Sequence, residues 1–383
     1  MKINKRRPSH WFYLFAFATQ SVIGLLLRRF TSKSVILLYG HKLNGNLLAI
    51  YRECPNAVFL SMDPAYCRQL KRQGIRYQWA CSFGASSLLA RAQAVISDHG
   101  LHSLEVLLPA YRRTGLKFFD VWHGIPYKGF DADDFRLQHR YDETWVASPL
   151  SRQLYIERFG FADDKIAVTG YARTDILVRP QRSNIEIRQE MGLPLAGSLI
   201  LFAPTWAQDE HGRNLFPFGH NEQEFLSELS RLAHKYEARI LLRTHLNSSA
   251  EDMTSHPNVL SLPSSQWPDT ESILQISDIL ICDWSSISFD YLLLDRPTFF
   301  LDVPAPFRKG FSLGPEYRFG CIVTSLSELI TQLESTLKAS ISYQEKYGEN
   351  HRFIRKKVYG DYADGLATQR CLERLEHHLE AKL

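Results

Sequence analysis

The chain has 383 residues, of which 45% are hydrophobic and 22% are charged, a composition typical of a soluble globular protein with room for two separate cores. Its six cysteines include no CxxC pair and no His/Cys cluster with zinc-ligand spacing, which argues against a zinc site and favours reduced thiols in a cytoplasmic compartment. The formal charge of +4 arises at one end, because residues 1–52 contain nine Lys or Arg and no acid. This local skew argues against a nucleic-acid-binding surface.

An apolar, aromatic stretch from Trp11 to Leu27 lies between basic clusters near the N-terminus. Its 17 residues are at the lower limit for a membrane-spanning helix, and four residues interrupt it: Thr19, Gln20, Ser21 and Gly24. No small-residue cleavage site follows, as a secretory signal peptide would require. We predict that residues 1–30 form a helix associated with an anionic membrane surface. A single membrane-spanning anchor and a helix packed on the protein's own core are the alternatives.

From Thr31 onward, short apolar runs alternate with helix-compatible stretches, the pattern of parallel strands flanked by helices. The first series predicts strands at Val35–Tyr39, Val58–Leu60, Ala94–Ser97, Lys117–Val121, Thr144–Ala147 and Ile166–Thr169. The second predicts strands at Leu199–Ala203, Arg239–Leu242, Val259–Leu262, Ile279–Cys282, Thr298–Leu301 and Cys321–Val323. We therefore expect an α/β fold with two Rossmann-like domains facing each other across a cleft, at residues 31–190 and 191–360, and a C-terminal helix at 361–383.

Polar residues follow six of these predicted strands, and ligands of open α/β sheets bind beyond the carboxyl ends of the strands. The residues are Asp98-His99, Trp122-His123, Arg173 with Asp175 after Gly170, Pro204-Thr205-Trp206, Arg243-Thr244-His245 and Asp283-Trp284-Ser285-Ser286. Six strand ends of this kind predict a lined binding cleft.

These residue types suit a phosphate diester or pyrophosphate. Arg173 and Arg243 could clamp phosphate oxygens, since the guanidinium matches them in bidentate contacts. His123 and His245 are the candidates for proton transfer near neutral pH. A structural alternative stands beside each assignment: a His after a strand is often only a hydrogen-bonding group, an Arg often pairs with a nearby acid, and Ser285 or Ser286 could simply cap a helix.

Several familiar sites are absent from the sequence. There is no GxxxxGK[ST] loop of a P-loop enzyme, no GxGxxG after the first predicted strand and no GxSxG nucleophile elbow. No DxD triplet stands at a strand end, since Asp131-Ala132-Asp133 lies in a predicted surface loop. A metal-dependent transferase built around DxD is therefore disfavoured.

The motifs, in order, resemble those of the CDP-glycerol glycerophosphotransferase family, the polymerases and primases of wall teichoic acid and related capsule polymers. The resemblance rests on Trp122-His123-Gly124-Ile125-Pro126 with Lys128, Val168-Thr169-Gly170 with Arg173, Phe202-Ala203-Pro204-Thr205-Trp206, Arg243-Thr244-His245, and Asp283-Trp284-Ser285-Ser286 with Phe289-Asp290 and Asp295-Arg296-Pro297. It covers some two thirds of the chain, and the last string is the most specific.

The resemblance implies a GT-B-like fold, with no cofactor and no required metal, that transfers glycerol phosphate from a CDP-alditol to a hydroxyl and releases CMP. The matched donor-binding positions are His123, Gly124, Ile125, Pro126, Tyr127, Arg173, Thr205, Trp206, Arg243, Thr244, His245, Ser285, Ser286 and Asp290. We expect His123 to act as the general base and His245, with Arg243, to stabilise charge on the transferring phosphate.

The chain departs from the family pattern beside the predicted donor site, where Trp284 replaces a usual Tyr and Ile125 a usual Ser or Thr. CDP-ribitol or another CDP-alditol therefore stays open as donor. The expected acceptor is a lipid-linked saccharide or polymer at the cytoplasmic face of the plasma membrane, with the enzyme peripheral to that membrane. Two further hypotheses are a GT-B glycosyltransferase that uses a nucleotide sugar and a non-catalytic membrane-tethered binding module.

Overall fold

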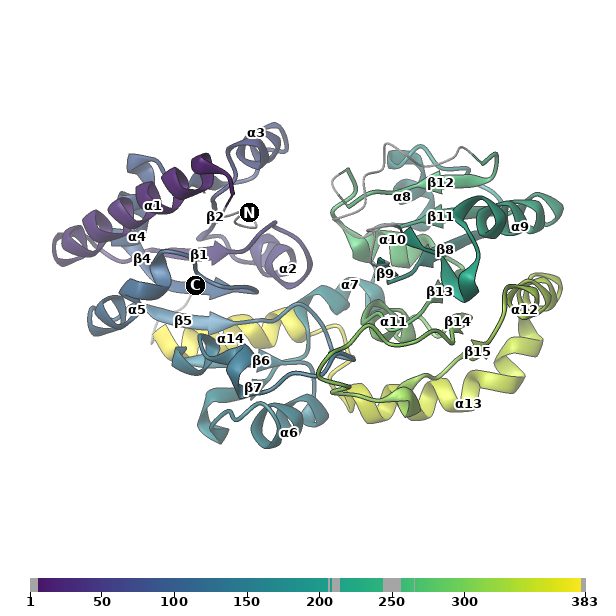
Figure 1. The fold of residues 1–383 in the computed structure, drawn as a ribbon. Helices are drawn as coiled ribbons and strands as arrows, with labels where there is room; N and C mark the ends of the chain where they lie inside the picture. The colour runs from purple at the N-terminus through teal and green to yellow at the C-terminus, as the bar shows by residue number, and fades with distance from the viewer. Residues whose placement is uncertain (1–5, 206, 209–213, 244–255, 265, 380–383) are drawn as a thin grey trace. The chain divides into compact units, whose positions relative to one another are not determined.

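The computed structural model describes residues 6–205, 207–208, 214–243, 256–264 and 266–379, which form two compact units (Figure 1). Unit 1 comprises Met1–His123, Asp131–Asp175 and Asp364–Leu383. Unit 2 comprises Gly124–Phe130 and Ile176–Ala363. Each unit contains one parallel sheet with helices packed on it, so the predicted α/β class with two parallel sheets is confirmed.

Unit 1 is built on a seven-stranded sheet in the order β3-β2-β1-β4-β5-β6-β7, and all its neighbouring strands are parallel. The strands are β1 (Val35–Tyr39), β2 (Ala57–Ser61), β3 (Tyr77–Trp79), β4 (Ala92–Ser97), β5 (Lys117–Asp120), β6 (Glu143–Val146) and β7 (Ile166–Val168). The helices are α1 (Pro8–Leu27), α2 (Gly45–Glu53), α3 (Pro64–Arg72), α4 (Phe83–Arg91), α5 (Leu104–Arg113), α6 (Pro149–Glu157) and α14 (Ala367–Leu379).

Unit 2 is built on a six-stranded parallel sheet in the order β12-β11-β8-β13-β14-β15. The strands are β8 (Leu199–Ala203), β11 (Arg239–Leu242), β12 (Val259–Ser261), β13 (Ile279–Cys282), β14 (Thr298–Leu301) and β15 (Cys321–Val323), with a separate hairpin of β9 (Ala207–Gln208) and β10 (Asn214–Leu215). The helices are α8 (Asn184–Glu190), α9 (Glu222–Lys235), α10 (Thr270–Ile276), α11 (Ile287–Leu292), α12 (Leu326–Lys338) and α13 (Ser340–Tyr359), after the short α7 (Asp175–Val178).

All twelve predicted strands are present, with ends that agree within two residues. They were recognisable because strands covered by helices on both faces carry continuous apolar runs, and β1, β8, β13 and β14 are buried along their whole length. The sequence did not reveal β3, a three-residue edge strand whose side chains are all half-buried. It also did not reveal the β9–β10 hairpin.

Helix α1 packs against α4 and α5 of unit 1. Its buried residues are Phe17, Gln20, Ser21 and Gly24, so three of the four polar or small interruptions in the apolar stretch form the packing stripe. An added Cβ at Gly24 would lie 2.9 Å from both Leu89 Cβ and Ser86 O, which shows how closely α1 approaches α4. Residues 8–30 are long and apolar enough to cross a membrane, with mean hydropathy 1.4. The packing nonetheless shows that α1 is also part of the core of unit 1.

The C-terminal helix α14 belongs to unit 1, although it follows the whole of unit 2 in sequence. Asp175 fixes its start, because the Asp175 carboxylate accepts hydrogen bonds from Ala367 N (2.9 Å) and Thr368 N (2.7 Å). Further along, Cys371 and Leu375 are buried in the unit 1 core. The C-terminal segment of the chain is therefore part of the same unit as the N-terminal segment.

Candidate functional site

The strand order reverses once in each sheet, and open α/β sheets bind ligands at such switch points. In unit 1 the reversal lies between β1 and β4, and in unit 2 between β8 and β13. His41 follows β1 and Asp98-His99 follow β4. Thr205 follows β8, and the Asp283–Ser286 segment follows β13. Each unit therefore carries polar residues at the one place in its sheet where a crevice is expected.

Asp283 joins the two strand ends at the switch point of unit 2. Both of its carboxylate oxygens accept a hydrogen bond from Thr205 N, at 2.9 and 2.8 Å. The Asp283 side chain is buried, and burial raises its pKa to about 6, while the hydrogen bonds from Thr205 act in the opposite direction. Asp283 thus holds Thr205 in place beside the segment that carries the serine pair.

The two serines after Asp283 are half-buried, and Asp290 lies one helical turn further on, buried in α11. Ser286 occupies the N-cap position of α11, but its hydroxyl makes no capping hydrogen bond. The helix start is instead tightened by Ser288, whose hydroxyl donates to Ser285 O at 2.9 Å. The capping alternative is therefore not what the structure shows for the Ser286 hydroxyl.

Arg243, which follows β11, is held by protein groups. Its Nη1 donates to Trp267 O (3.0 Å) and Leu262 O (3.4 Å), and its Nη2 donates to Thr270 Oγ1 (2.8 Å). Burial lowers its pKa, and Glu271 partly offsets that effect. Arg243 therefore organises the chain between β12 and α10. Three other predicted site residues, Trp206, Thr244 and His245, lie outside the described residues.

In unit 1, the backbone around His123 is braced from two sides. Arg173 Nη1 donates to His123 O at 2.6 Å. Asn46 Nδ2 donates to Val121 O (2.8 Å) and Trp122 O (2.9 Å), while Asn46 Oδ1 accepts from Arg173 N (3.1 Å). The structure thus brings His123 and Arg173 together as predicted partners of one site. Asn46 could not be recognised from the sequence, because a lone Asn near a helix start usually serves that helix.

The imidazole of His123 is oriented by Asp98 and His99. Its Nδ1 lies 3.4 Å from Asp98 O, and its ring stacks on that of His99 at a centroid distance of 4.9 Å and an angle of 12°. A carbonyl oxygen only accepts, so Nδ1 carries the proton and Nε2 presents its lone pair. Although part of the side chain is exposed, desolvation by its surroundings lowers the pKa of His123, and His99 lowers it further. Both effects favour the uncharged imidazole.

The residues after His123 pack within unit 2. Tyr127 is buried against Phe289 and Trp284, with ring centroids 4.6 and 5.9 Å away. Its carbonyl accepts from Ser312 N at 2.7 Å, and Gly129 N donates to Gly310 O at 2.7 Å. Gly124, Ile125 and Pro126 are also buried. In this segment the apolar side chains therefore serve the packing of unit 2.

Trp284 is the residue around which that packing is built. Its indole Nε1 donates to Val303 O at 2.7 Å, its ring lies 4.8 Å from that of Phe311, and the Arg318 guanidinium lies 4.3 Å from its ring centroid. Only 6% of the Trp284 side chain is exposed. Trp284 thus joins the end of β13 to the β14–β15 connection.

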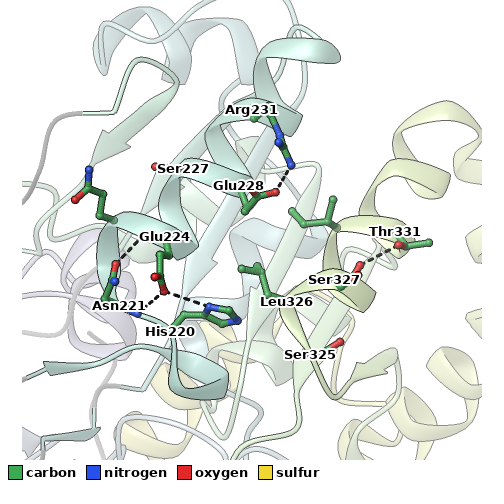
Figure 2. Close-up of a pocket in the computed structure, with 12 residues that line it drawn as sticks. His220, Asn221, Glu224, Ser227, Glu228, Arg231, Ser325, Leu326, Ser327 and Thr331 are labelled. Carbon is green, nitrogen blue, oxygen red and sulfur yellow. Dashed lines mark hydrogen bonds and ion pairs between the residues drawn. The ribbon is translucent and has the colours of Figure 1, made fainter.

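A groove of about 1060 Å³ lies elsewhere in unit 2, between the first turns of α9 and α12 (Figure 2). None of its lining residues is one of the predicted site residues. Its charged groups pair with one another: Arg231 with Glu228, and His220 with Glu224 at 3.4 Å. We therefore place the candidate site at the switch points and not in this groove.

The comparisons with known proteins all indicate the same family. The model of the family described as CDP-Glycerol:Poly(glycerophosphate) glycerophosphotransferase matches residues 26–377. A teichoic acid poly(glycerol phosphate) polymerase of Staphylococcus epidermidis is 29% identical over 280 residues, covering 65% of this chain and 38% of the relative. A teichoic acid glycerol-phosphate transferase of Staphylococcus aureus is 27% identical over 292 residues, covering 69% of this chain and 72% of the relative.

The fold is also similar to a solved structure, that of the wall teichoic acid polymerase TagF. The TM-score is 0.74 at 21% identity, with 95% of this chain and 94% of the solved chain covered. At that identity the likeness concerns the fold alone. The chain spans little more than a third of the length of the first polymerase named above.

Proposed function

Because the chain belongs to the CDP-glycerol:poly(glycerophosphate) glycerophosphotransferase family, we propose that it transfers a polyol phosphate from a CDP-alditol to an acceptor hydroxyl in the synthesis of a teichoic-acid-like or capsule polymer. One observation supports this most: the family match covers residues 26–377. Within it, Thr205 and the Ser285-Ser286 pair follow β8 and β13, the strands that border the switch point of unit 2. CDP-glycerol is the first candidate donor.

The proposed reaction is a displacement at the β-phosphorus of the donor. An oxygen of the acceptor hydroxyl forms the new P–O bond, its proton goes to Nε2 of His123, and the P–O bond to CMP breaks with the electron pair leaving on CMP. His123 suits this role because its Nδ1 is turned toward Asp98 O and its ring is uncharged at neutral pH. Its backbone is fixed by Arg173 and Asn46, which would limit motion of the base.

The donor would lie against Thr205, Ser285, Ser286 and Asp290, with Arg173 contacting phosphate oxygens. His245 and Arg243 keep their proposed role in stabilising charge on the transferring phosphate. For Arg243 this role would be exerted partly through the segment that its guanidinium holds. We also propose that the two units form a GT-B-like pair, with residues 31–190 on the acceptor side and residues 191–360 on the donor side.

The acceptor would be a lipid-linked saccharide or polymer, and the enzyme would be peripheral on the cytoplasmic face of the plasma membrane. The surface of α1 that faces away from α4 supports this, because Trp11, Phe12 and Phe15 are exposed there and Phe30 is exposed just beyond. Arg6, Arg7 and Arg29 are exposed beside them. Aromatic side chains flanked by arginines suit the interface of an anionic bilayer. A single spanning anchor is the alternative.

The deciding experiment incubates the full chain with a lipid-linked saccharide acceptor and either CDP-glycerol, CDP-ribitol or a UDP-sugar. We expect release of CMP and, by mass spectrometry, addition of one or more polyol phosphate units. His123→Ala should abolish turnover and spare CDP-glycerol binding, whereas His377→Gln, on the exposed face of α14, should leave both intact. UDP release would instead favour a glycosyltransferase, and donor binding without any turnover would favour a binding module.

A further inference from the structure

Three helices of unit 1, α1, α4 and α5, pack on the same core cluster and carry exposed apolar side chains outside it (Figure 1). Phe17 of α1, Leu89 of α4 and Leu108 of α5 all lie in that cluster. The exposed apolar residues are Trp11, Phe12, Phe15, Val22 and Leu26 of α1, Phe83 of α4 and Val106 of α5. Phe83 and Val106 are each 81% exposed. An apolar surface contributed by three neighbouring helices indicates a site of interaction with a partner or a membrane.

The exposed and the buried residues of α1 lie on opposite sides of the helix. At the helical repeat, the five exposed apolar residues of α1 fall within an arc of about 100°. The buried residues fall within a second arc of about 100° on the opposite side, and they are Phe17, Gln20, Ser21 and Gly24. The exposed apolar face of α1 therefore points away from the core of unit 1.

Helix α1 is also tied to the other two helices by hydrogen bonds to its far end. The buried hydroxyl of Tyr111 donates to Ser21 O. Just after the helix, Arg28 is only 4% exposed, and its Nη1 donates to Leu89 O (2.9 Å) and Ala92 O (2.7 Å). A spanning orientation would pull α1 out of this layer and leave these buried polar groups without partners, which is costly. The packing therefore favours a helix that stays on unit 1.

The charges of the three helices suit an anionic surface. Among the residues of α1, α4 and α5, all of which the structure describes except at the far N-terminal flank, only Glu105 is acidic. Exposed arginines flank the helices, and they are Arg6, Arg7, Arg29, Arg91 and Arg113. Aromatic rings insert among lipid headgroups, and neighbouring guanidinium groups contact lipid phosphates. An anionic bilayer is therefore the partner that fits both the apolar and the charged groups.

The apolar residues of α4 and α5 lie at one particular end of the layer. Both helices begin soon after β3 and β4 end, so their first turns lie at the carboxyl edge of the unit 1 sheet, and these turns contain Phe83 and Val106. Ser103 Oγ donates to Leu14 O at 2.7 Å, which brings the aromatic start of α1 to the same end. His123 follows β5 at this edge. The aromatic part of the surface and the proposed base therefore share one edge of the sheet.

We propose that unit 1 docks on an anionic bilayer through the outer face of α1, α4 and α5, with α1 lying flat among the headgroups and the carboxyl edge of the sheet held at the membrane surface. This gives the membrane location proposed above a defined surface, and it assigns α1 to that surface instead of to a spanning anchor. An acceptor whose lipid stays in the bilayer then reaches His123 without leaving the membrane. Docking does not depend on the transferase function, and only this delivery step rests on it.

The first test measures docking alone, by sedimentation of the full chain with vesicles of phosphatidylcholine, either pure or with phosphatidylglycerol added. We expect binding to increase with phosphatidylglycerol. Phe83→Ser and Val106→Ser should each weaken it about fivefold, although neither residue belongs to α1. Both side chains are 81% exposed, so the melting temperature should not fall. Ile185→Ser, at a position 57% exposed on α8 of unit 2, is the matched control and should bind as the wild type does.

Three outcomes would overturn the docking surface. Wild-type binding by both Phe83→Ser and Val106→Ser would exclude α4 and α5 from it, and binding that ignores phosphatidylglycerol would exclude the anionic partner. Retention of the chain in membranes after alkaline carbonate extraction would show a spanning α1. Self-association in the absence of vesicles that Phe83→Ser abolishes would show that a second copy of the chain covers this face.

The delivery step is tested once turnover is established. Phe83→Ser should raise the KM for an acceptor embedded in vesicles about fivefold and leave kcat/KM for a water-soluble acceptor analogue unchanged. Equal effects on the two acceptors would overturn delivery from the membrane. If the variants lose vesicle binding as expected and no CDP-alditol is turned over, the docking surface stands and the proposed function fails.

Discussion

Replacing Trp284 with Phe should loosen the segment that directly follows His123. The change removes the hydrogen bond from indole Nε1 to Val303 O, worth about 1 kcal/mol. It also leaves a smaller ring in a site that is 6% exposed, at a cost of roughly 1 kcal/mol. The contact with the Arg318 guanidinium weakens by about 0.5 kcal/mol. The free energy of unfolding of unit 2 should therefore fall by roughly 2 to 3 kcal/mol.

Urea unfolding followed by circular dichroism gives the overall loss, and hydrogen exchange gives its location. The amides of Gly129 and Ser312, which donate to Gly310 O and Tyr127 O, should exchange faster in Trp284→Phe. Trp11→Phe is the matched control, because Trp11 is 54% exposed and its loss should change stability by less than about 0.5 kcal/mol. Wild-type stability together with unchanged exchange at Gly129 and Ser312 would refute this account of Trp284.

Three further predictions concern other parts of the chain. Because burial raises the pKa of Asp283 to about 6, unit 2 should lose stability as pH rises from 4 to 7, and urea midpoints of Asp283→Asn should show a flatter pH dependence. Gly24→Leu should displace α1 from α4 and lower the free energy of unfolding by about 1 to 3 kcal/mol, measured by thermal melting, whereas exposed Val22→Leu should not. Phe15→Ser, at a position 74% exposed, should weaken binding to anionic vesicles in a sedimentation assay without lowering the melting temperature; unchanged binding would contradict the proposed membrane surface.

Much of the two sheets could be predicted from sequence because central strands such as β1, β8 and β13 are buried along their whole length and appear as unbroken apolar runs. The polar residues of the site could be predicted for a related reason: a run that ends abruptly in His, Arg or Ser marks a carboxyl strand end. Neither signal exists for Asn46. It lies at the start of α2, 75 residues before the carbonyl of Val121 that it holds, and only the fold brings the two together.

The first helix shows how one pattern can support two structures. Gln20, Ser21 and Gly24 interrupt a hydrophobic stretch, and small or polar interruptions suggest a helix that does not span a membrane. They do not reveal that the interruptions form the packing face while Phe12 and Phe15 remain exposed. Tyr111 accounts for the burial of this polar face of α1, because its buried hydroxyl donates to Ser21 O. Its close approach to α1 also requires small residues on that face. Long-range packing of this kind leaves no trace in local sequence.

The motif around His123 makes contacts in both units, and the change from one unit to the other falls between His123 and Gly124. His123 is held by unit 1 through Asp98, His99 and Arg173, whereas the following residues are buried in unit 2 through Tyr127. This continuous motif therefore combines a proposed base with the residues that anchor the segment after it. A side chain at Gly129 should therefore disturb the segment that follows His123. An added Cβ there would overlap Lys309 O and push the segment off the β14–β15 connection, and the displacement would reach His123 through only six residues of chain.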